Sequence, residues 1–455
     1  MMKRRFGFAI KVCAIIFLLL LTFQSLLAQG LIRKGRLGVG VTEITDEIQL
    51  KSDLESKKGV FVKEVFPDTS AQESGMEKED IILKINGIDI VNVSQFLNLM
   101  DTYRGGDELL ILLWRNKERI EKKVILKPFP KESSPDFDVF YMSVTVDERT
   151  CLRTIVTKPK IDKKYPAVLL IQGLSCSSID YPFDDKPPYK NPYKSIVYSL
   201  TEQGFVTMRV EKSAVGDSEG IQAKDIDFNT EVFGFQKALE MLKTCEFVDS
   251  QNVFIFGHSM GGVMAPVIAN NISVRGIIVF GTVSKTWIEY ELENSRRQGL
   301  LKREDFVRLE EGMKNRESLL YHLYIEKLTP KEIILRYPEL RGSFDDEEHM
   351  YGRHYMFFRQ LYDINLSEKW QNANSSVLAI WGESDFVSGF GDHQLIVDIV
   401  NKYYPGKGTL IQIENMDHSF LYARSMSESY HNGNNLSFNP VIIETMSQWM
   451  KKLIK

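Results

Sequence analysis

The chain has little of several features that would point to particular classes of protein. Its four cysteines are too few and too scattered to indicate a disulfide scaffold or a zinc site. Basic residues (57) do not outnumber acidic ones (61), and the formal charge is -4, so we predict no nucleic-acid binding. Apolar residues make up 43% of the 455 residues, which excludes wholesale disorder, collagen and a polytopic membrane protein. A globular chain of two or more domains remains.

A short apolar run lies at the N-terminus. Basic residues come first, an apolar stretch follows from Val12 to Leu21, and a small residue, Ala28, comes later. This order is typical of a signal peptide, and the run is shorter than the roughly 20 residues that span a bilayer. We therefore expect residues 1–28 to be removed on export to the periplasm or beyond, with an uncleaved membrane anchor as the alternative. The remaining cysteines are Cys151, Cys176 and Cys245, of which at most two can pair with each other, and the sequence alone leaves both the paired and the unpaired state open.

Residues 31–128 alternate strand-like runs with turns. Ile81–Ile85 is one predicted strand, and it ends in Asn86-Gly87, a pair typical of a tight turn. Ser94–Tyr103 is a predicted helix, with Ser94 as its cap. The composition indicates a small β-rich domain.

The pattern changes after the Pro- and Ser-rich stretch 129–136, which is a predicted linker. From 137 to 455, continuous apolar strands alternate with helical stretches. The strands are Ala167–Ile171, Phe205–Met208, Val253–Phe256, Gly276–Phe280 and Val377–Trp381. This alternation predicts an α/β fold with a mostly parallel sheet covered on both faces. Residues 284–374 interrupt it with a charged helical insertion. We interpret the insertion as a lid over a cleft, with a surface helix pair as the alternative.

One motif indicates a nucleophile. Gly257-His258-Ser259-Met260-Gly261 follows a predicted strand and opens a predicted helix. In G-x-S-x-G the serine sits on a strained turn that lifts its hydroxyl clear of the sheet, and the glycines let neighbouring backbone approach. Ser259 is the predicted nucleophile, and the Met260 amide is one predicted oxyanion donor. Cys176 is a rival nucleophile that lacks this context.

An activated serine needs a base, and the base needs a group that orients it. His418 is the preferred base because it follows the predicted strand Thr409–Glu414. The other histidines adjoin the nucleophile or lie in the insertion, at a helix start or in a polar segment: His258, His322, His349, His354, His393 and His431. Asp385, just past the preceding strand, is the predicted acid, with Glu383 and Asp392 as alternatives.

The second oxyanion donor should come from the turn after Ala167–Ile171. This turn reads Gln172-Gly173-Leu174-Ser175, and we predict that the Leu174 N–H is the donor.

The order Ser259, Asp385, His418 resembles that of the α/β-hydrolase superfamily, and the resemblance covers residues 137–455. It implies the fold described above and hydrolysis without a metal or cofactor. The segment 216–220, Gly-Asp-Ser-Glu-Gly, resembles a family loop that shapes the cleft floor and holds no second nucleophile. Many members carry His-Gly at the oxyanion turn, where this chain has Gln172-Gly173.

Residues 31–128 resemble a PDZ domain of the bacterial periplasmic-protease type, on the stretches Pro67–Met76 and Asp80–Gly87. The resemblance implies that the loop Leu37-Gly38-Val39-Gly40 holds a C-terminal carboxylate and that a peptide adds as a strand beside it. The alternative is a PDZ domain that docks on its own hydrolase domain.

Together these features predict an exported serine hydrolase that works through an acyl-enzyme. A small-molecule carboxylic ester is the preferred substrate, and a peptide, cleaved in the manner of an aminopeptidase, is the alternative. In that alternative the acidic run Asp345–Glu348 would hold the substrate amine. A non-catalytic PDZ-containing adaptor is a second alternative, against which the complete set of Ser259, Asp385 and His418 argues.

Overall fold

The computed structural model describes residues 30–183 and 192–454. Its contacts divide the chain between Pro130 and Lys131 into two units, inside the predicted linker 129–136. The predicted signal peptide, residues 1–28, lies outside the described residues. Among the residues that are described, no helix is both long and apolar enough to cross a membrane.

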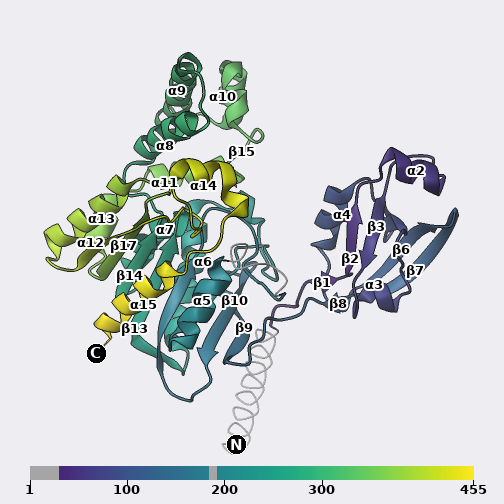
Figure 1. Ribbon diagram of the computed structural model, residues 1–455, viewed down its shortest axis with the longest axis horizontal. Helices are drawn as coiled ribbons and strands as arrows, with labels where there is room; N and C mark the ends of the chain where they lie inside the picture. The colour runs from purple at the N-terminus through teal and green to yellow at the C-terminus, as the bar shows by residue number, and fades with distance from the viewer. Residues whose placement is uncertain (1–29, 184–191, 455) are drawn as a thin grey trace, which may run out of the picture. The chain divides into compact units, whose positions relative to one another are not determined.

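The first unit is a small β-rich domain built on an antiparallel sheet of order β2-β3-β4-β6-β7, with β5 beside β4. Its elements, labelled in Figure 1, are β1 (Gly35–Arg36), β2 (Val39–Thr42), α2 (Asp46–Ser52), β3 (Val60–Val65), α3 (Ser70–Glu73), β4 (Ile81–Ile85), β5 (Ile88–Asp89), α4 (Val93–Met100), β6 (Glu108–Arg115), β7 (Glu118–Ile125) and β8 (Lys127–Pro128). The predicted turn is confirmed, since Asn86 and Gly87 have φ of 48° and 80°. The predicted cap Ser94 is wrong: the extended residue Asn92 accepts the Gln95 amide instead, and Ser94 already lies within α4.

The second unit is an α/β domain with an eight-stranded sheet of order β9-β10-β12-β11-β13-β14-β17-β18. Strand β10 is antiparallel to both neighbours, and all other pairs are parallel. The strands are β9 (Phe137–Thr145), β10 (Cys151–Pro159), β11 (Tyr165–Ile171), β12 (Val206–Val210), β13 (Val248–His258), β14 (Gly276–Phe280), β17 (Ser376–Gly382) and β18 (Gly408–Ile413). The mostly parallel sheet is therefore confirmed, whereas the antiparallel pair β9–β10 was not recognised in the sequence.

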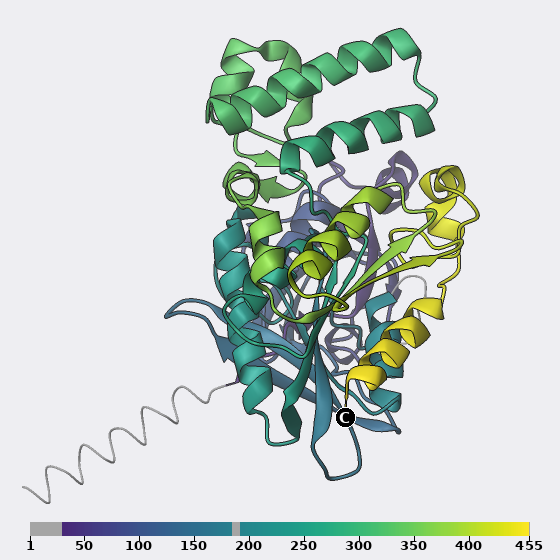
Figure 2. The ribbon, with the colours of Figure 1, turned by 90° about the vertical axis from the view of Figure 1, so that its left-hand side faces the viewer.

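Helices cover both faces of this sheet (Figure 2). They are α5 (Pro192–Glu202), α6 (Phe228–Thr244), α7 (Met260–Ala269), α13 (Phe390–Tyr403) and α15 (Val441–Leu453). Helix α14 (Met426–Asn432) instead contacts α8. Because alternate residues of a strand face opposite sides, Val253 and Ile255 of β13 join the core beneath α6 and α7. Phe254 and Phe256 join the core beneath α5 and α15.

Part of the predicted linker belongs to this core. Glu132 is fully buried, and its carboxylate pairs with Arg209 of β12 at 2.8 Å. Burial alone would raise the pKa of Glu132, but the charge and hydrogen bonds of Arg209 outweigh burial and lower it to about 2. The chain is thus anchored to the second unit within two residues of the division.

The segment 284–374 is largely helical, as predicted, but only part of it stands apart from the sheet. Its elements are α8 (Trp287–Leu301), α9 (Phe306–Leu320), the π-helical turn η3 (Tyr321–Ile325), α10 (Pro330–Arg336), η4 (Pro338–Ser343), the hairpin β15 (His349–Met350) and β16 (Arg353–His354), α11 (Tyr355–Tyr362) and α12 (Leu366–Asn372). The last two helices belong to the body, since Phe357 of α11 packs on Phe228 of α6, and Asn270 beside α7 donates to the Lys369 carbonyl of α12.

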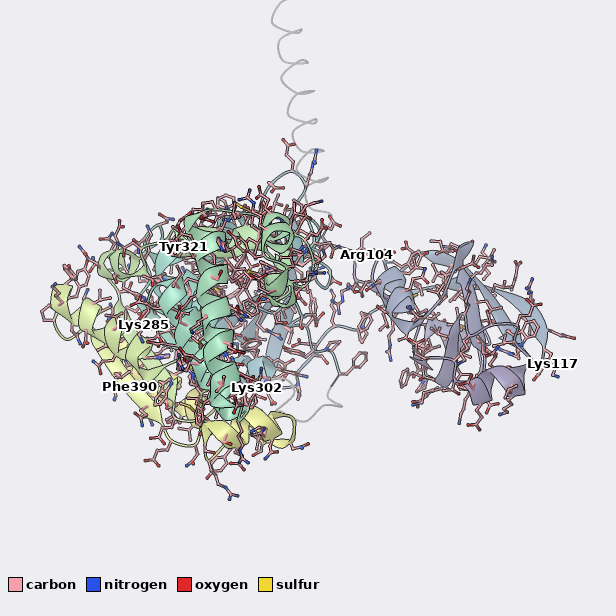
Figure 3. The ribbon with its side chains drawn as sticks, turned by 90° about the horizontal axis from the view of Figure 1, so that it is seen from above. Arg104, Lys117, Lys285, Lys302, Tyr321 and Phe390 are labelled. Carbon is pink, nitrogen blue, oxygen red and sulfur yellow. The ribbon has the colours of Figure 1, made fainter. Side chains whose placement is uncertain are left out.

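The first helices of this segment gather at one end of the second unit. The segment enters after the carboxyl end of β14, and α8 to α10 lie together beyond that end of the sheet (Figures 1 and 2). Seen from above, α8 runs from near Lys285 to near Lys302, and α9 returns toward Tyr321 (Figure 3). The lid interpretation requires this placement, because α/β sheets bind ligands at the carboxyl ends of their strands.

Candidate active site

Ser259 occupies a strained turn between β13 and α7. Its backbone has φ 54° and ψ −120°, a conformation that costs energy for a residue with a side chain. The flanking glycines make this turn possible. A Cβ on Gly257 would lie 2.4 Å from the Gly261 carbonyl oxygen, and a Cβ on Gly261 would lie 2.0 Å from the Ile171 carbonyl oxygen. The G-x-S-x-G spacing is thus a packing requirement of this turn.

We expect Gly261→Ala to lower the free energy of unfolding by about 1–3 kcal/mol, because the new methyl group can only fit if β11 or α7 shifts. Thermal unfolding measures this loss. The matched control is Gly312→Ala in α9, where an added Cβ meets nothing within 4 Å. The control should be neutral or stabilise by about 0.5–1 kcal/mol, since alanine favours a helix. Equal unfolding temperatures for the two variants would contradict the packing argument.

Asp385 and His418 are brought together in the loops that follow β17 and β18. Asp385 is fully buried, and its Oδ2 lies 2.9 Å from Nδ1 of His418. The loop also supplies donors to this carboxylate: the Val387 and Ser388 amides at 2.7 and 2.9 Å, and the Ser388 hydroxyl at 2.6 Å. Burial would raise the pKa of Asp385, but the charge of His418 and these hydrogen bonds lower it to about 2. Asp385 is therefore an anion at neutral pH.

The contact with Asp385 fixes the tautomer of the His418 ring. Burial lowers the pKa of His418, but the negative charge and hydrogen bond of Asp385 outweigh burial and raise it above the ordinary 6.5. Because Nδ1–H donates to Asp385, Nε2 is the nitrogen that can accept a proton. In the structure the Ser259 hydroxyl has no hydrogen-bond partner among the described residues, so it does not yet engage His418. Catalytic hydrogen bonds are commonly long in a ligand-free enzyme and tighten with substrate.

His258, next to the nucleophile, ties the surrounding loops together. The Gly173 N–H donates to the Tyr193 hydroxyl at 3.1 Å, and this hydroxyl lies 2.6 Å from Nδ1 of His258. Because the His418 carbonyl, 2.9 Å from Nε2 of His258, can only accept, Nε2 carries the proton of the neutral ring and Tyr193 donates to Nδ1. Burial lowers the pKa of His258 to about 3, in keeping with a neutral ring. One hydrogen-bond chain thus links the turn of Gly173, the turn of Ser259 and the loop of His418.

The turn that carries the predicted donor Leu174 lies beside Ser259. A Cβ on Gly173 would lie 3.7 Å from Oγ of Ser259, so the turn and the serine are in contact. Tyr193 already occupies the Gly173 N–H. Within the described chain, the Leu174 and Met260 amides have no protein acceptor. Both can therefore donate to a bound group, as an oxyanion site requires.

The rival acids have other partners. Glu383 pairs with the side chain of Gln412. Asp392 is buried and accepts the Ser284 amide at 2.9 Å, which fastens the start of the insertion. Neither carboxylate contacts His418.

The remaining histidines have structural contacts. His393 is buried and accepts the Thr282 amide, His322 pairs with Glu326, and His349 bridges Asp225 and Asp346. His354 caps α11, and His431 contacts the Leu301 carbonyl. Cys176 is a free thiol, as are Cys151 and Cys245. The described residues contain no group of three or more His, Cys, Asp or Glu side chains able to hold a metal ion.

The second glycine-flanked serine has a structural environment. Ser218 accepts the Arg153 amide at 2.9 Å, and Asp217 pairs with the Arg153 side chain at 3.1 Å. Both side chains are buried and hold the loop against β10.

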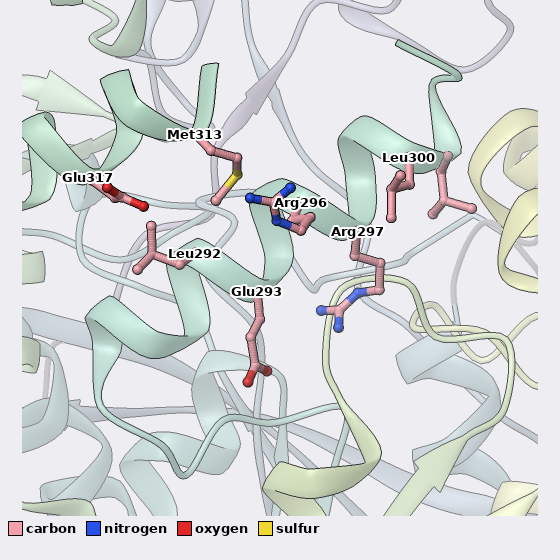
Figure 4. Close-up of a pocket in the computed structure, with 8 residues that line it drawn as sticks. Leu292, Glu293, Arg296, Arg297, Leu300, Met313 and Glu317 are labelled. Carbon is pink, nitrogen blue, oxygen red and sulfur yellow. The ribbon is translucent and has the colours of Figure 1, made fainter. Parts of the chain in front are cut away.

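A groove in the insertion adjoins the acid loop. It is a cavity of about 730 Å³ between α8 and α9, with Leu292, Leu300 and Met313 among its walls (Figure 4). Arg297 lines this groove, and its guanidinium donates to the Phe386 and Val387 carbonyls at 2.7 and 2.9 Å. The insertion thus supports the loop that carries Asp385.

In the first unit, the predicted carboxylate loop Leu37–Gly40 overlaps an edge strand, since its last two residues, Val39 and Gly40, already belong to β2. Gly38 has φ 85°, and a Cβ there would lie 2.2 Å from the Thr69 side chain, so only glycine fits. Strand β2 pairs with β3 and has no second neighbour among the described strands. Its outer edge is available for an added peptide strand.

Comparisons with known proteins agree with the two units. A family model described as serine aminopeptidase, S33, matches residues 189–423, more than half of the chain. A PDZ-domain model matches residues 28–104.

Curated proteins and solved structures match each unit separately. Esterase EstD of Thermotoga maritima is 26% identical over 184 residues, 40% of this chain and 41% of that protein. The periplasmic pH-dependent serine endoprotease DegQ of Escherichia coli is 30% identical over 103 residues, 23% of each chain. The chain therefore spans less than half the length of these curated relatives. Est1E from Butyrivibrio proteoclasticus, solved with ferulic acid, has a TM-score of 0.44 and 16% identity, over 69% of this chain and 99% of that chain.

Proposed function

The chain belongs to the serine aminopeptidase, S33, family of α/β hydrolases and carries an N-terminal PDZ domain, and we propose that its hydrolase unit cleaves carboxylic esters with Ser259 as the nucleophile. The observation that carries this proposal is the placement of Ser259 on a strained turn beside the loop of the Asp385–His418 pair. His258, in the turn of Ser259, contacts the His418 carbonyl and so joins this turn directly to the loop of His418.

The proposed reaction follows from this geometry. His418 takes the Ser259 proton at Nε2 as the hydroxyl oxygen attacks the ester carbonyl carbon. The Leu174 and Met260 amides stabilise the oxyanion that forms. His418 returns the proton to the departing alkoxide, which leaves an acyl-enzyme. A water molecule, activated by His418, then hydrolyses the acyl-enzyme and frees Ser259. Asp385 holds the imidazole tautomer and stabilises the imidazolium.

The contacts that the carboxylates of Asp345–Glu348 already make favour an ester over a peptide substrate. An aminopeptidase needs an unpaired acid to hold the substrate amine, but three of the four candidates are engaged. Asp345 accepts the Gly352 amide, Asp346 pairs with His349, and Glu347 pairs with Lys331.

Kinetics on a pair of substrates test the preference. We expect a short-chain acyl nitrophenyl ester to be cleaved with a higher kcat/KM than an aminoacyl nitroanilide, by about 10²-fold or more, because three of the four carboxylates that could hold the amine are already engaged. The Ser259→Ala variant supplies the background rate for both substrates. Faster cleavage of the anilide would reject the ester proposal in favour of the peptidase, and the family description makes that the second candidate.

The PDZ domain and the N-terminus complete the proposal. The loop Leu37–Gly40 and the open edge of β2 support binding of a C-terminal peptide. The basic, then apolar, start of the chain supports export to the periplasm, and PDZ-containing relatives such as DegQ are periplasmic by name.

A further inference from the structure

Three buried charges lie behind the oxyanion turn, and the reaction proposed above does not use them. Lys212 follows β12, Glu231 lies in the first turn of α6, and Arg353 belongs to β16 in the insertion. Their side chains are at most 5% exposed. Burying a charge is costly unless it is paired and hydrogen-bonded. The partners of these groups therefore show what the cluster holds in place.

The Lys212 ammonium donates two hydrogen bonds, both to carbonyls of the oxyanion turn, and forms one ion pair. It donates to the Gly173 carbonyl at 2.8 Å and the Leu174 carbonyl at 3.1 Å, and it pairs with Glu231 at 3.0 Å. Arg353 pairs with the other Glu231 oxygen and donates to the Leu174 carbonyl at 3.3 Å. Glu231 thus holds two cations, and both of them reach the same turn.

The direction of these bonds determines where the Leu174 amide points. The C=O of Gly173 and the N–H of Leu174 belong to one peptide plane, and in a trans peptide they point in opposite directions. None of the peptide bonds described in this chain is cis. A cation that holds the Gly173 carbonyl therefore fixes the Leu174 N–H so that it points away from the cation. Charge on the donor also polarises the peptide, which strengthens its N–H as a donor.

We propose that Lys212 is a positioning residue that aims the Leu174 amide at the oxyanion, with Glu231 and Arg353 holding its ammonium and the turn in register. The inference rests on the proposed hydrolase function. Through Arg353, the insertion then contributes to the reaction by holding the oxyanion turn. This contribution does not depend on whether the helices of the insertion cover the cleft.

The decisive variant is Lys212→Met, which keeps a long side chain but removes the ammonium. We expect kcat for the nitrophenyl ester to fall by about 10²- to 10³-fold with KM nearly unchanged, the effect of losing one oxyanion donor. The inhibition constant of a trifluoromethyl ketone, whose adduct with Ser259 carries an oxyanion, should rise by about the same factor. Rates are normalised to the fraction of enzyme that a fluorophosphonate probe labels at completion. An unchanged inhibition constant in the labelled fraction would overturn the proposal.

Arg209→Met is the matched control, because Arg209 is another fully buried cation paired with a glutamate, Glu132, but does not contact the oxyanion turn. It should lower the unfolding temperature without changing the inhibition constant. If Lys212→Met does not fold, Arg353→Lys carries the test. It keeps a cation beside Glu231 but loses the contact with the Leu174 carbonyl, and a rise of about 2- to 10-fold in the inhibition constant is expected. A wild-type protein that neither reacts with the probe nor cleaves the ester would instead refute the proposed function itself.

Discussion

Replacing Ser259 with alanine should lower ester hydrolysis by about 10⁶-fold and abolish labelling by a fluorophosphonate probe. The alcohol oxygen is the only atom in the proposed reaction that bonds to the substrate carbon, so its removal leaves only the binding and oxyanion contributions. The variant should stay folded, because the Ser259 hydroxyl has no hydrogen-bond partner among the described residues. Steady-state rates, probe labelling and thermal unfolding of the same preparation test the three expectations together.

Two matched variants separate Ser259 from its rivals. Ser218→Ala removes the other serine that lies between two glycines, and Cys176→Ala removes a free thiol close to the oxyanion turn. Both should keep full labelling. Ser218→Ala should lower stability, because the Arg153 amide loses its buried acceptor. Labelling that persists in Ser259→Ala but disappears in one of these variants would move the nucleophile to that residue.

Much of the fold could be predicted from the sequence because the relevant signals are local. Continuous apolar runs identified β11 to β14 and β17, since strands of a parallel sheet are buried on both faces. The pair β9–β10 was missed because β9 mixes buried and half-exposed residues and precedes the regular alternation of strands and helices. The insertion was assigned as one helical unit because composition does not reveal which helices pack on the sheet.

The candidate site divides in the same way. Ser259, Asp385 and His418 follow strands, so motif and chain order were enough to select them. Tyr193, Lys212 and Arg353 were not selected, because their roles come from contacts between segments distant in sequence. A lysine placed two residues after a fully buried strand was the one available signal for Lys212. The structure also explains His258, which the sequence excluded as a base without assigning it a role.

The loops that carry Asp385 and His418 are held in place by residues from other parts of the second unit. Arg297 of α8 holds the carbonyls that follow Asp385, and His258 holds the carbonyl of His418. The insertion therefore supports the acid loop through Arg297 and the oxyanion turn through Arg353. Substitutions in the insertion can then change the rate without touching substrate, and this would distinguish a supporting insertion from one that only covers the cleft.

Asp385→Asn should lower kcat by about 10⁴-fold at neutral pH while the protein stays folded. The asparagine oxygen can still accept the Val387 and Ser388 amides. Its NH₂ group would then face His418 and donate to Nδ1, so the ring would carry its proton on Nε2. An imidazole in that tautomer cannot accept the Ser259 proton. Asp392→Asn is the control, because that buried carboxylate binds the Ser284 amide and leaves His418 untouched.

The pH profile adds a signed test of the same pair. The base must be neutral, so wild-type kcat/KM should fall as the pH drops through the pKa of His418, which Asp385 raises above 6.5. Removing the carboxylate charge lowers that pKa, so the acid limb of Asp385→Asn should move to lower pH. Its plateau should remain about 10⁴-fold below that of the wild type. An acid limb that stays in place while Asp392→Asn shifts it would assign the acid to Asp392.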